Sequence, residues 1–103
     1  MCGFCGIVNY KRNLSNDYDI IQNMINTLSS RGPDEDGIFM NTNVNFGHKR
    51  LIVIDPENGK QPMHFSFQNN IYTIVYNGQI YNTAELKNIL IKNGFTFDGH
   101  CDT

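Results

Sequence analysis

Cys2 is the residue whose position most directly indicates chemistry. Aminopeptidases remove an initiator methionine when the next residue is small, so the mature chain would carry an α-amino group and a thiol on one residue. The amine titrates at about 7.7–8.0 and the thiol at about 8.5, which suits proton transfer at neutral pH. The amine can therefore act as general base for its own side chain, directly or through one water molecule. Position alone also fits an incidental terminal cysteine.

Other positions carry groups suited to a substrate that bears both charges. Arg50 has a planar guanidinium that can bind both oxygens of a carboxylate, although a surface arginine on a strand is a common alternative. Asn77 and Gly78 indicate a hairpin turn, but the side-chain amide and the Gly78 N–H are also two donors for an oxyanion. Asp102 is either a surface charge or a partner for an ammonium group.

The cysteines leave a metal or redox site open as an alternative. Cys2 and Cys5 have C-x-x-C spacing, and His100 and Cys101 are permitted zinc ligands. Redox motifs of this spacing normally open a helix after a strand, whereas here a strand is expected to follow. The histidines of the chain match no metal spacing. We therefore predict no metal site and expect Cys5 to be a small buried hydrophobic residue.

The elements that must position these residues follow from the apolar pattern. Helical spacing of apolar residues predicts an amphipathic helix over 17–30, which the Arg31-Gly32-Pro33-Asp34 segment ends. A second helix is expected to begin near Asn82, in a capping-box pattern, and to end before Gly94. Alternating or continuous apolar runs predict strands. The expected strands are residues 2–9, 37–40, 44–54, 71–76 and 95–98.

The composition limits the class of protein. The chain has 103 residues, of which 40% are hydrophobic, so one packed α+β domain is expected, and the order of elements indicates that it is cut off. The net charge of -2 and the absence of a basic stripe argue against nucleic acid. No apolar run is long enough to span a membrane, and no signal peptide is evident. We expect a cytoplasmic protein whose three cysteines are free thiols.

Five motifs in order give a resemblance that covers essentially the whole chain. They are Met1-Cys2-Gly3, Arg31-Gly32-Pro33-Asp34 with Gly37, His48-x-Arg50-Leu51-x-Val53-x-Asp55, Gln61-Pro62-Met63, and Asn77-Gly78-x-Ile80-Tyr81-Asn82. Together they resemble the class II glutamine amidotransferases, which use an N-terminal nucleophile. Within that class the sequence looks most like the glutamine-hydrolysing asparagine synthetases, because the other relatives carry different residues after Arg-Gly.

The resemblance implies a role for each candidate in the reaction. Cys2 would be the nucleophile that forms a glutamyl thioester. Asn77 and Gly78 would supply the oxyanion hole. Glutamate and ammonia would be the products.

It also implies the groups that bind glutamine. Arg50 would hold the α-carboxylate and Asp102 the α-amino group, while backbone atoms near Leu51 and Val53 would line the pocket. Gln79 stands where the family more often has Glu. It would keep an acceptor oxygen for the substrate but lose the charge.

For the whole protein, the resemblance implies the N-terminal-nucleophile hydrolase sandwich, with two antiparallel sheets between helical layers. Residues 1–103 would be the N-terminal part of the glutaminase domain. A synthetase domain that uses ATP and Mg to convert aspartate to asparagine would lie outside this chain, and no cofactor is expected within it. The alternatives left open are a non-catalytic, self-associating piece of the same fold and, less in keeping with the pattern, a Cys-x-x-Cys zinc or redox module.

Overall fold

Strands and helices are interspersed along the chain, and both sheets are antiparallel. A computed structural model describes all residues, 1–103. The predicted α+β class is confirmed to this extent: helices and antiparallel strands occur together in one chain. The elements are β1 (Gly3–Val8), α1 (Tyr18–Asn26), β2 (Glu35–Met40), β3 (Val44–Arg50), β4 (Met63–Phe67), β5 (Asn70–Ile74) and α2 (Thr83–Lys92).

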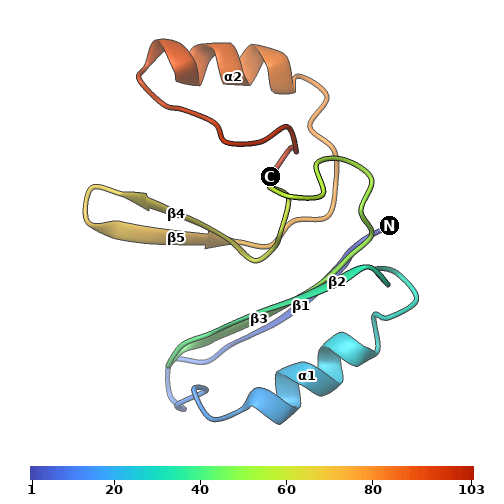
Figure 1. Ribbon diagram of the computed structural model, residues 1–103. Helices are drawn as coiled ribbons and strands as arrows, with labels where there is room; N and C mark the ends of the chain where they lie inside the picture. Colours follow the sequence, from blue (N-terminus) through green and yellow to red (C-terminus); the bar gives the residue numbers. More distant parts are fainter.

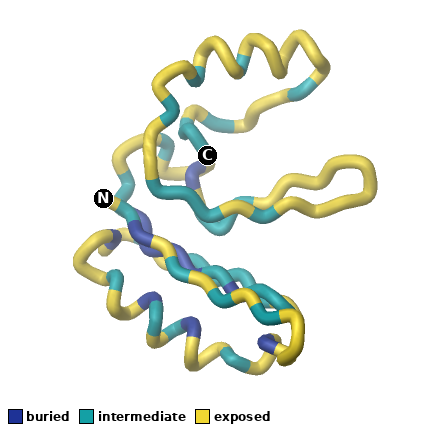
Figure 2. The backbone as a smooth tube through the Cα atoms, turned by 180° about the vertical axis from the view of Figure 1, so that it is seen from behind, coloured by how far each residue is buried: buried dark blue, intermediate teal, exposed yellow.

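The three-stranded unit, residues 1–50, contains the hydrophobic core of the molecule. Its strand order is β1-β3-β2, and α1 lies against one face of this sheet (Figure 1). Ile21 and Ile25 of α1 are 0% exposed, as is Leu14 in the preceding loop. Gly47 of β3 permits this packing, because a Cβ there would lie 2.3 Å from Cγ1 of Ile25. Buried residues concentrate along α1 and β3 in Figure 2.

The central position of β3 brings the chemically interesting residues to one end of this sheet. In the antiparallel registers Gly3 pairs with Lys49, and Glu35 pairs with Arg50. Cys2 precedes Gly3, so the N-terminus, the start of β2 and the end of β3 lie at the same edge. The loop that leaves β3 begins there as well.

The hairpin unit, residues 63–103, consists of the β4–β5 hairpin, α2 and the segment that follows it. Figure 1 shows the hairpin and α2 on the side of the three-stranded sheet opposite α1. The hairpin turns at Gln68 and Asn69, whose φ angles are 47° and 64°, the left-handed values that a tight primed turn requires. No residue of α2 is buried. Neither helix is long and apolar enough to cross a membrane.

Most predicted elements are confirmed, with different ends. The first strand, both helices and the strands at 37–40 and 71–76 correspond to β1, α1, α2, β2 and β5. Asp17 and Asn82 are the N-cap residues, but neither side chain makes a cap hydrogen bond, so the predicted capping box at Asn82 is wrong. Both side-chain caps are absent because the N-cap backbones do not have the extended geometry that capping prefers.

Three predictions about strands are wrong. The strand over 44–54 ends at Arg50, because the backbone N–H of Ile52 donates to the Asp34 carboxylate instead of to a neighbouring strand. Asn77-Gly78 does not form a hairpin turn, since the turn lies earlier in the chain. Residues 95–98 have no partner strand and are irregular, while β4 received no prediction.

Candidate active site

A cavity of about 510 Å³ lies between the end of the three-stranded sheet, the loop after β3 and the last residues of the chain. Four separate segments contribute to its wall. Every residue that the sequence predicts for the site lines this cavity: Cys2, Arg50, Leu51, Val53, Asn77, Gly78, Gln79 and Asp102. The structure therefore brings the candidates together, while the individual role of each stays a prediction.

The Cys2 thiol is held against the backbone of Leu51. The Leu51 N–H donates to Cys2 Sγ at 3.3 Å, and the thiol lies 3.6 Å from the Leu51 carbonyl oxygen. Arg31 Nε donates to the Cys2 carbonyl at 3.1 Å and so fixes the residue from its backbone side. These contacts fix the position of the sulfur at the wall of the cavity.

Cys5 lies in a different environment. It is on β1 opposite Gly47, and burial raises the pKa of its thiol above the ordinary value. A raised pKa keeps the thiol protonated at neutral pH, which makes it a poor nucleophile. All three cysteines are free. No group of three His, Cys, Asp or Glu side chains is placed to hold a metal ion.

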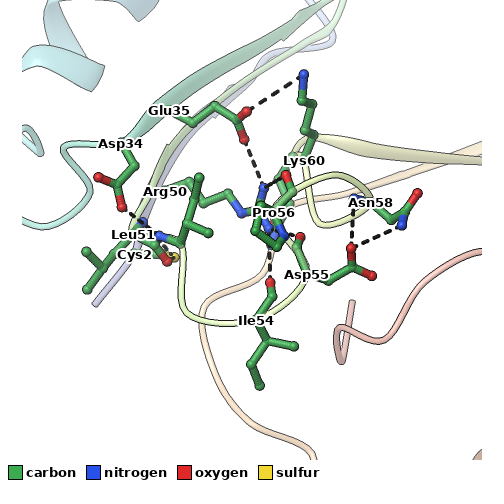
Figure 3. Close-up of polar contacts among 12 residues, drawn as sticks. Cys2, Asp34, Glu35, Arg50, Leu51, Ile54, Asp55, Pro56, Asn58 and Lys60 are labelled. Atoms are coloured by element: carbon green, nitrogen blue, oxygen red, sulfur yellow. Dashed lines mark hydrogen bonds and ion pairs between the residues drawn. The ribbon is translucent and has the colours of Figure 1, made fainter.

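The Arg31–Asp34 segment does not end α1 as predicted, since the helix stops at Asn26, but it packs on the sheet. A Cβ on Gly32 would lie 2.3 Å from the carbonyl carbon of Lys49, so this segment packs directly on the backbone of β3. The Asp34 N–H donates to the Arg50 carbonyl at 3.0 Å, and the Asp34 carboxylate accepts from Ile52 N–H at 2.8 Å (Figure 3). These bonds direct the chain out of β3 and toward the cavity.

Arg50, the last residue of β3, holds the loop that follows this strand through several hydrogen bonds. Its side chain is 6% exposed, and its Nη1 atom donates to Glu35 Oε2 at 3.1 Å, forming an ion pair. The remaining bonds of its terminal nitrogens go to loop carbonyls, at 2.6–3.2 Å (Figure 3). These carbonyls belong to Ile54, Asp55 and Pro56. The guanidinium therefore holds the loop that forms this wall of the cavity.

The Asn77-Gly78 segment is positioned by the residue before it. Tyr76 N–H donates to Gln61 Oε1 at 2.6 Å, and the Tyr76 carbonyl lies 3.2 Å from Nε2 of His48. A carbonyl only accepts, so this histidine nitrogen carries the hydrogen. His48 is 1% exposed, and burial lowers its pKa below the ordinary value, which keeps the ring neutral.

Asp102 is oriented by two donors. Its Oδ2 accepts from Ile80 N–H at 2.8 Å, and its Oδ1 lies 3.2 Å from the Thr83 hydroxyl, which shares its one hydrogen with the Ile80 carbonyl at 2.5 Å. A carboxylate can accept about four hydrogen bonds, so these two leave capacity for an ammonium group. The next residue, Thr103, accepts from Gln61 Nε2 at 3.1 Å.

A second carboxylate joins the loop to the last segment. Asp55 Oδ2 accepts from His100 N–H at 2.6 Å, and Oδ1 accepts from the backbone and side chain of Asn58. The N–H donor of His100, followed by that of Asn58, holds the pKa of Asp55 below its usual range. Asp55 has a φ of 51°, so the loop turns sharply at this residue.

Several residues of the site have no individual signal in the sequence. Glu35 and His48 do not line the cavity and contact residues that do, while Gln61 lines it and also bonds to Tyr76. Gln61 appears in the sequence only as part of the Gln61-Pro62-Met63 motif, and His48 was expected to be purely structural. His48 and Gln61 belong to motifs of the family, which marks the two residues in the sequence. A motif does not show which partner each side chain contacts.

Comparison with known proteins adds an independent finding. A family model described as a glutamine amidotransferase domain matches residues 1–103. The chain is 43% identical over 103 residues to asparagine synthetase [glutamine-hydrolyzing] 3 of Bacillus subtilis, which covers 100% of this chain and 17% of that protein. It is 31% identical over 102 residues to asparagine synthetase [glutamine-hydrolyzing] of Brassica oleracea, covering 99% of the chain and 17% of the relative. The chain thus spans about a sixth of the length of these relatives.

Proposed function

Because the chain belongs to the glutamine amidotransferase domain family, we propose that it hydrolyses glutamine to glutamate and ammonia with Cys2 as the nucleophile. The observation that carries the proposal is the shared cavity. A thiol, two candidate oxyanion donors and a cation–anion pair of the type that glutamine requires all line it. The proposed reaction is an acyl transfer that passes through a thioester intermediate.

The reaction divides into two halves. After Met1 is removed, the α-amine of Cys2 takes the thiol proton, and the sulfur attacks the side-chain carboxamide carbon of glutamine. Asn77 and Gly78 donate to the oxygen that becomes negative. Collapse of this intermediate returns the proton to the leaving nitrogen, which departs as ammonia and leaves a glutamyl thioester. Water then attacks the thioester carbonyl, and glutamate and the thiol are released.

Binding of the amino-acid end of glutamine requires a change at Arg50. Its terminal nitrogens donate to loop carbonyls and to Glu35, so the substrate carboxylate replaces one or more of these acceptors. Asp102 binds the substrate ammonium, and Gln79 adds a neutral acceptor beside it. The backbone of Leu51 and Val53 forms the adjoining wall. Charge-assisted contacts of this type contribute about 1.5–3 kcal/mol each.

We further propose that residues 1–103 are the N-terminal part of an N-terminal-nucleophile hydrolase sandwich. The order α1, three-stranded sheet, hairpin and α2 in Figure 1 supports two antiparallel sheets between helical layers. In the full-length protein the ammonia would serve ATP- and Mg-dependent asparagine synthesis from aspartate. The names of the relatives support asparagine synthesis, whereas ATP, Mg and aspartate are implied by the family resemblance and would bind outside these residues. The reaction would take place in the cytoplasm, where free thiols persist.

The isolated 103-residue chain is a poor candidate for turnover. Apolar residues on both faces of the hairpin unit are exposed, among them Phe65, Ile71, Ile89 and Ile91. Exposed apolar patches and bare strand edges favour association with other chains. We propose that this chain alone self-associates and releases little or no glutamate, so activity is tested in the full-length protein.

The deciding experiment measures glutamate released from glutamine by the full-length protein that contains this chain. Cys2→Ala is expected to abolish release, while Cys5→Ser, on the adjoining strand β1, keeps most of it. Ammonia-dependent synthesis by the Cys2→Ala variant is expected to survive, because free ammonia bypasses this site. Undiminished glutamine hydrolysis in the Cys2→Ala protein would sink the proposal.

A further inference from the structure

Gln61 joins three parts of the cavity that are far apart in the sequence. Its side-chain oxygen accepts from Tyr76 N–H at 2.6 Å, and its side-chain nitrogen donates to the Thr103 hydroxyl at 3.1 Å. The orientation of the amide is fixed by chemistry, since a backbone N–H can only donate and must therefore face the oxygen. Gln61 itself lines the cavity.

The two partners of Gln61 are the neighbours of the predicted working groups. Tyr76 immediately precedes the oxyanion candidates Asn77 and Gly78, and Thr103 immediately follows Asp102. One side chain therefore links the segment that would stabilise the oxyanion to the segment that would hold the substrate ammonium.

The backbone of Gln61 is itself held firmly. A Cβ on Gly37 would lie 1.7 Å from the Gln61 carbonyl oxygen, so the chain at Gln61 packs directly on β2. The side chain thus extends from the three-stranded unit, which contains the buried core, toward the hairpin unit, which contains none of the buried hydrophobic residues. His48, on β3, holds the other side of the same Tyr76 residue through its carbonyl. Tyr76 is therefore held from both sides, by His48 of β3 and by Gln61 of the loop that packs on β2.

We propose that Gln61 is a positioning residue for glutamine hydrolysis: it sets the places of Asn77-Gly78 and of Asp102 around Cys2 by bonding to the backbone of Tyr76 and to Thr103. The inference rests on the proposed function of the cavity. Donors that stabilise a developing charge act only when they are preorganised, and a displacement of about 1 Å costs about 10²-fold in rate. Gln61 touches no reacting atom, so its loss is expected to cost less than the loss of Cys2.

The two bonds of Gln61 predict different kinetic effects. Gln61→Met has similar length and removes both bonds, and kcat for glutamine hydrolysis is expected to fall about 10–100-fold. Thr103→Val removes only the bond beside Asp102, so it is expected to raise KM for glutamine about 3–10-fold with a smaller change in kcat. Thr103→Ser keeps the hydroxyl and is expected to restore both constants to within about twofold of the parent.

The controls separate positioning from folding. Gln22→Met makes the same substitution on α1, away from the cavity, and is expected to leave all rates unchanged. Alkylation of Cys2 by iodoacetamide needs no oxyanion donor, so its rate in Gln61→Met should match that of the parent. Ammonia-dependent synthesis in the full-length variant reports that the rest of the protein is intact.

Each result bears on one idea. If Gln61→Met keeps kcat within twofold while Cys2→Ala is inactive, the positioning role is overturned and the proposed function stands. If Cys2→Ala still hydrolyses glutamine, the proposed function itself fails. If Gln61→Met does not fold, the Thr103 pair decides: equal KM values for Thr103→Val and Thr103→Ser would overturn the inference, and a raised KM in Thr103→Val alone would support it.

Discussion

The three-stranded unit and the hairpin unit differ in how they are stabilised. In the first, α1 covers the sheet and buries Ile21 and Ile25 completely. In the second, α2 buries no residue, and the two strands of the hairpin pair only with each other. An isolated hairpin is marginally stable in water, whereas a sheet covered by a helix has its own core. The contrast shows that half of this chain supplies its own packing and the other half depends on additional contacts.

The candidate chemistry lies where the two units meet. Cys2 and Arg50 come from the edge of the packed sheet, while Asn77, Gly78 and Asp102 come from the less packed unit. The candidate nucleophile and the candidate cation therefore lie at the edge of the packed sheet, and the other candidate groups lie in the unit that has no buried hydrophobic residue. Individual bonds tie those segments to the loop after β3: Asp55 accepts from His100 N–H, and Gln61 bonds to Tyr76 and Thr103.

The largest expected effect concerns Met1, at the edge of the three-stranded unit where Cys2 lies. If Met1 is retained, the nitrogen of Cys2 is a non-basic amide, and Met1 also occupies the lining of the cavity. General-base assistance is worth about 10²–10⁴-fold in rate, so full-length protein with Met1 retained should lose activity on that scale. Mass spectrometry of the N-terminus alongside the glutaminase rate is the measurement. Full activity in a preparation that uniformly retains Met1 would contradict the mechanism.

The second prediction compares the two helices directly. Ile25→Ala removes a fully buried side chain from α1 and is expected to lower the free energy of unfolding by about 2–5 kcal/mol. Leu86→Ala removes a side chain of α2 that is 41% exposed, and a loss below about 1 kcal/mol is expected. Urea unfolding followed by circular dichroism measures both. Equal losses would show that α2 is as well packed as α1.

The third prediction compares one glycine from each unit. A Cβ on Gly32 would meet the backbone of Lys49, so Gly32→Ala forces a backbone shift that costs about 1–3 kcal/mol. Gly94 follows α2 with a φ of 90° and open space around it, so Gly94→Ala costs only backbone strain, about 1 kcal/mol. The same unfolding measurement ranks them. A larger loss for Gly94→Ala would reverse the assignment of the tightly packed unit.

The smallest expected effect is the pH dependence contributed by His48. Burial lowers its pKa in the folded protein, so the unfolded chain binds the proton more readily. The contribution to stability is complete above the ordinary pKa of 6.5 and is lost as pH falls through the lowered value. His48→Gln, which keeps a donor, should flatten stability between neutral and mildly acidic pH. If the free energy of unfolding changes with pH as steeply in this variant as in the parent, another group is responsible for the pH dependence.

The sequence predicts best what depends on local pattern. β1, α1 and α2 follow from apolar spacing that is visible within a few residues. The hairpin turn at Gln68-Asn69 has no glycine, and β4 follows a proline, so neither has the usual local signature. Asn77-Gly78 has that signature but is held by long-range bonds to its neighbour Tyr76, which local pattern does not report.

The candidate site shows the same division. Residue type and order identify Cys2, Arg50 and Asp102, and all of them line the cavity. The residues that support them could not be predicted from the sequence. Glu35 meets Arg50 because β2 and β3 pair in this register, and Gln61 meets Tyr76 because of the path of the loop before β4. Arg50 is the instructive case. Its type indicates a carboxylate partner, and the partner in the structure is Glu35 together with loop carbonyls.

If Arg50 binds the carboxylate of glutamine as proposed, its bonds to the loop after β3 make that binding an exchange of hydrogen-bond acceptors. If the loop releases these donors only part of the time, the measured affinity is the intrinsic affinity multiplied by the released fraction. The observed rate constant for glutamine association would then reach a plateau at high glutamine concentration, equal to the rate constant for release of the loop. A substitution that weakens the loop without changing Arg50 would tighten glutamine binding and raise that plateau. The loop would then be less ordered in the absence of glutamine.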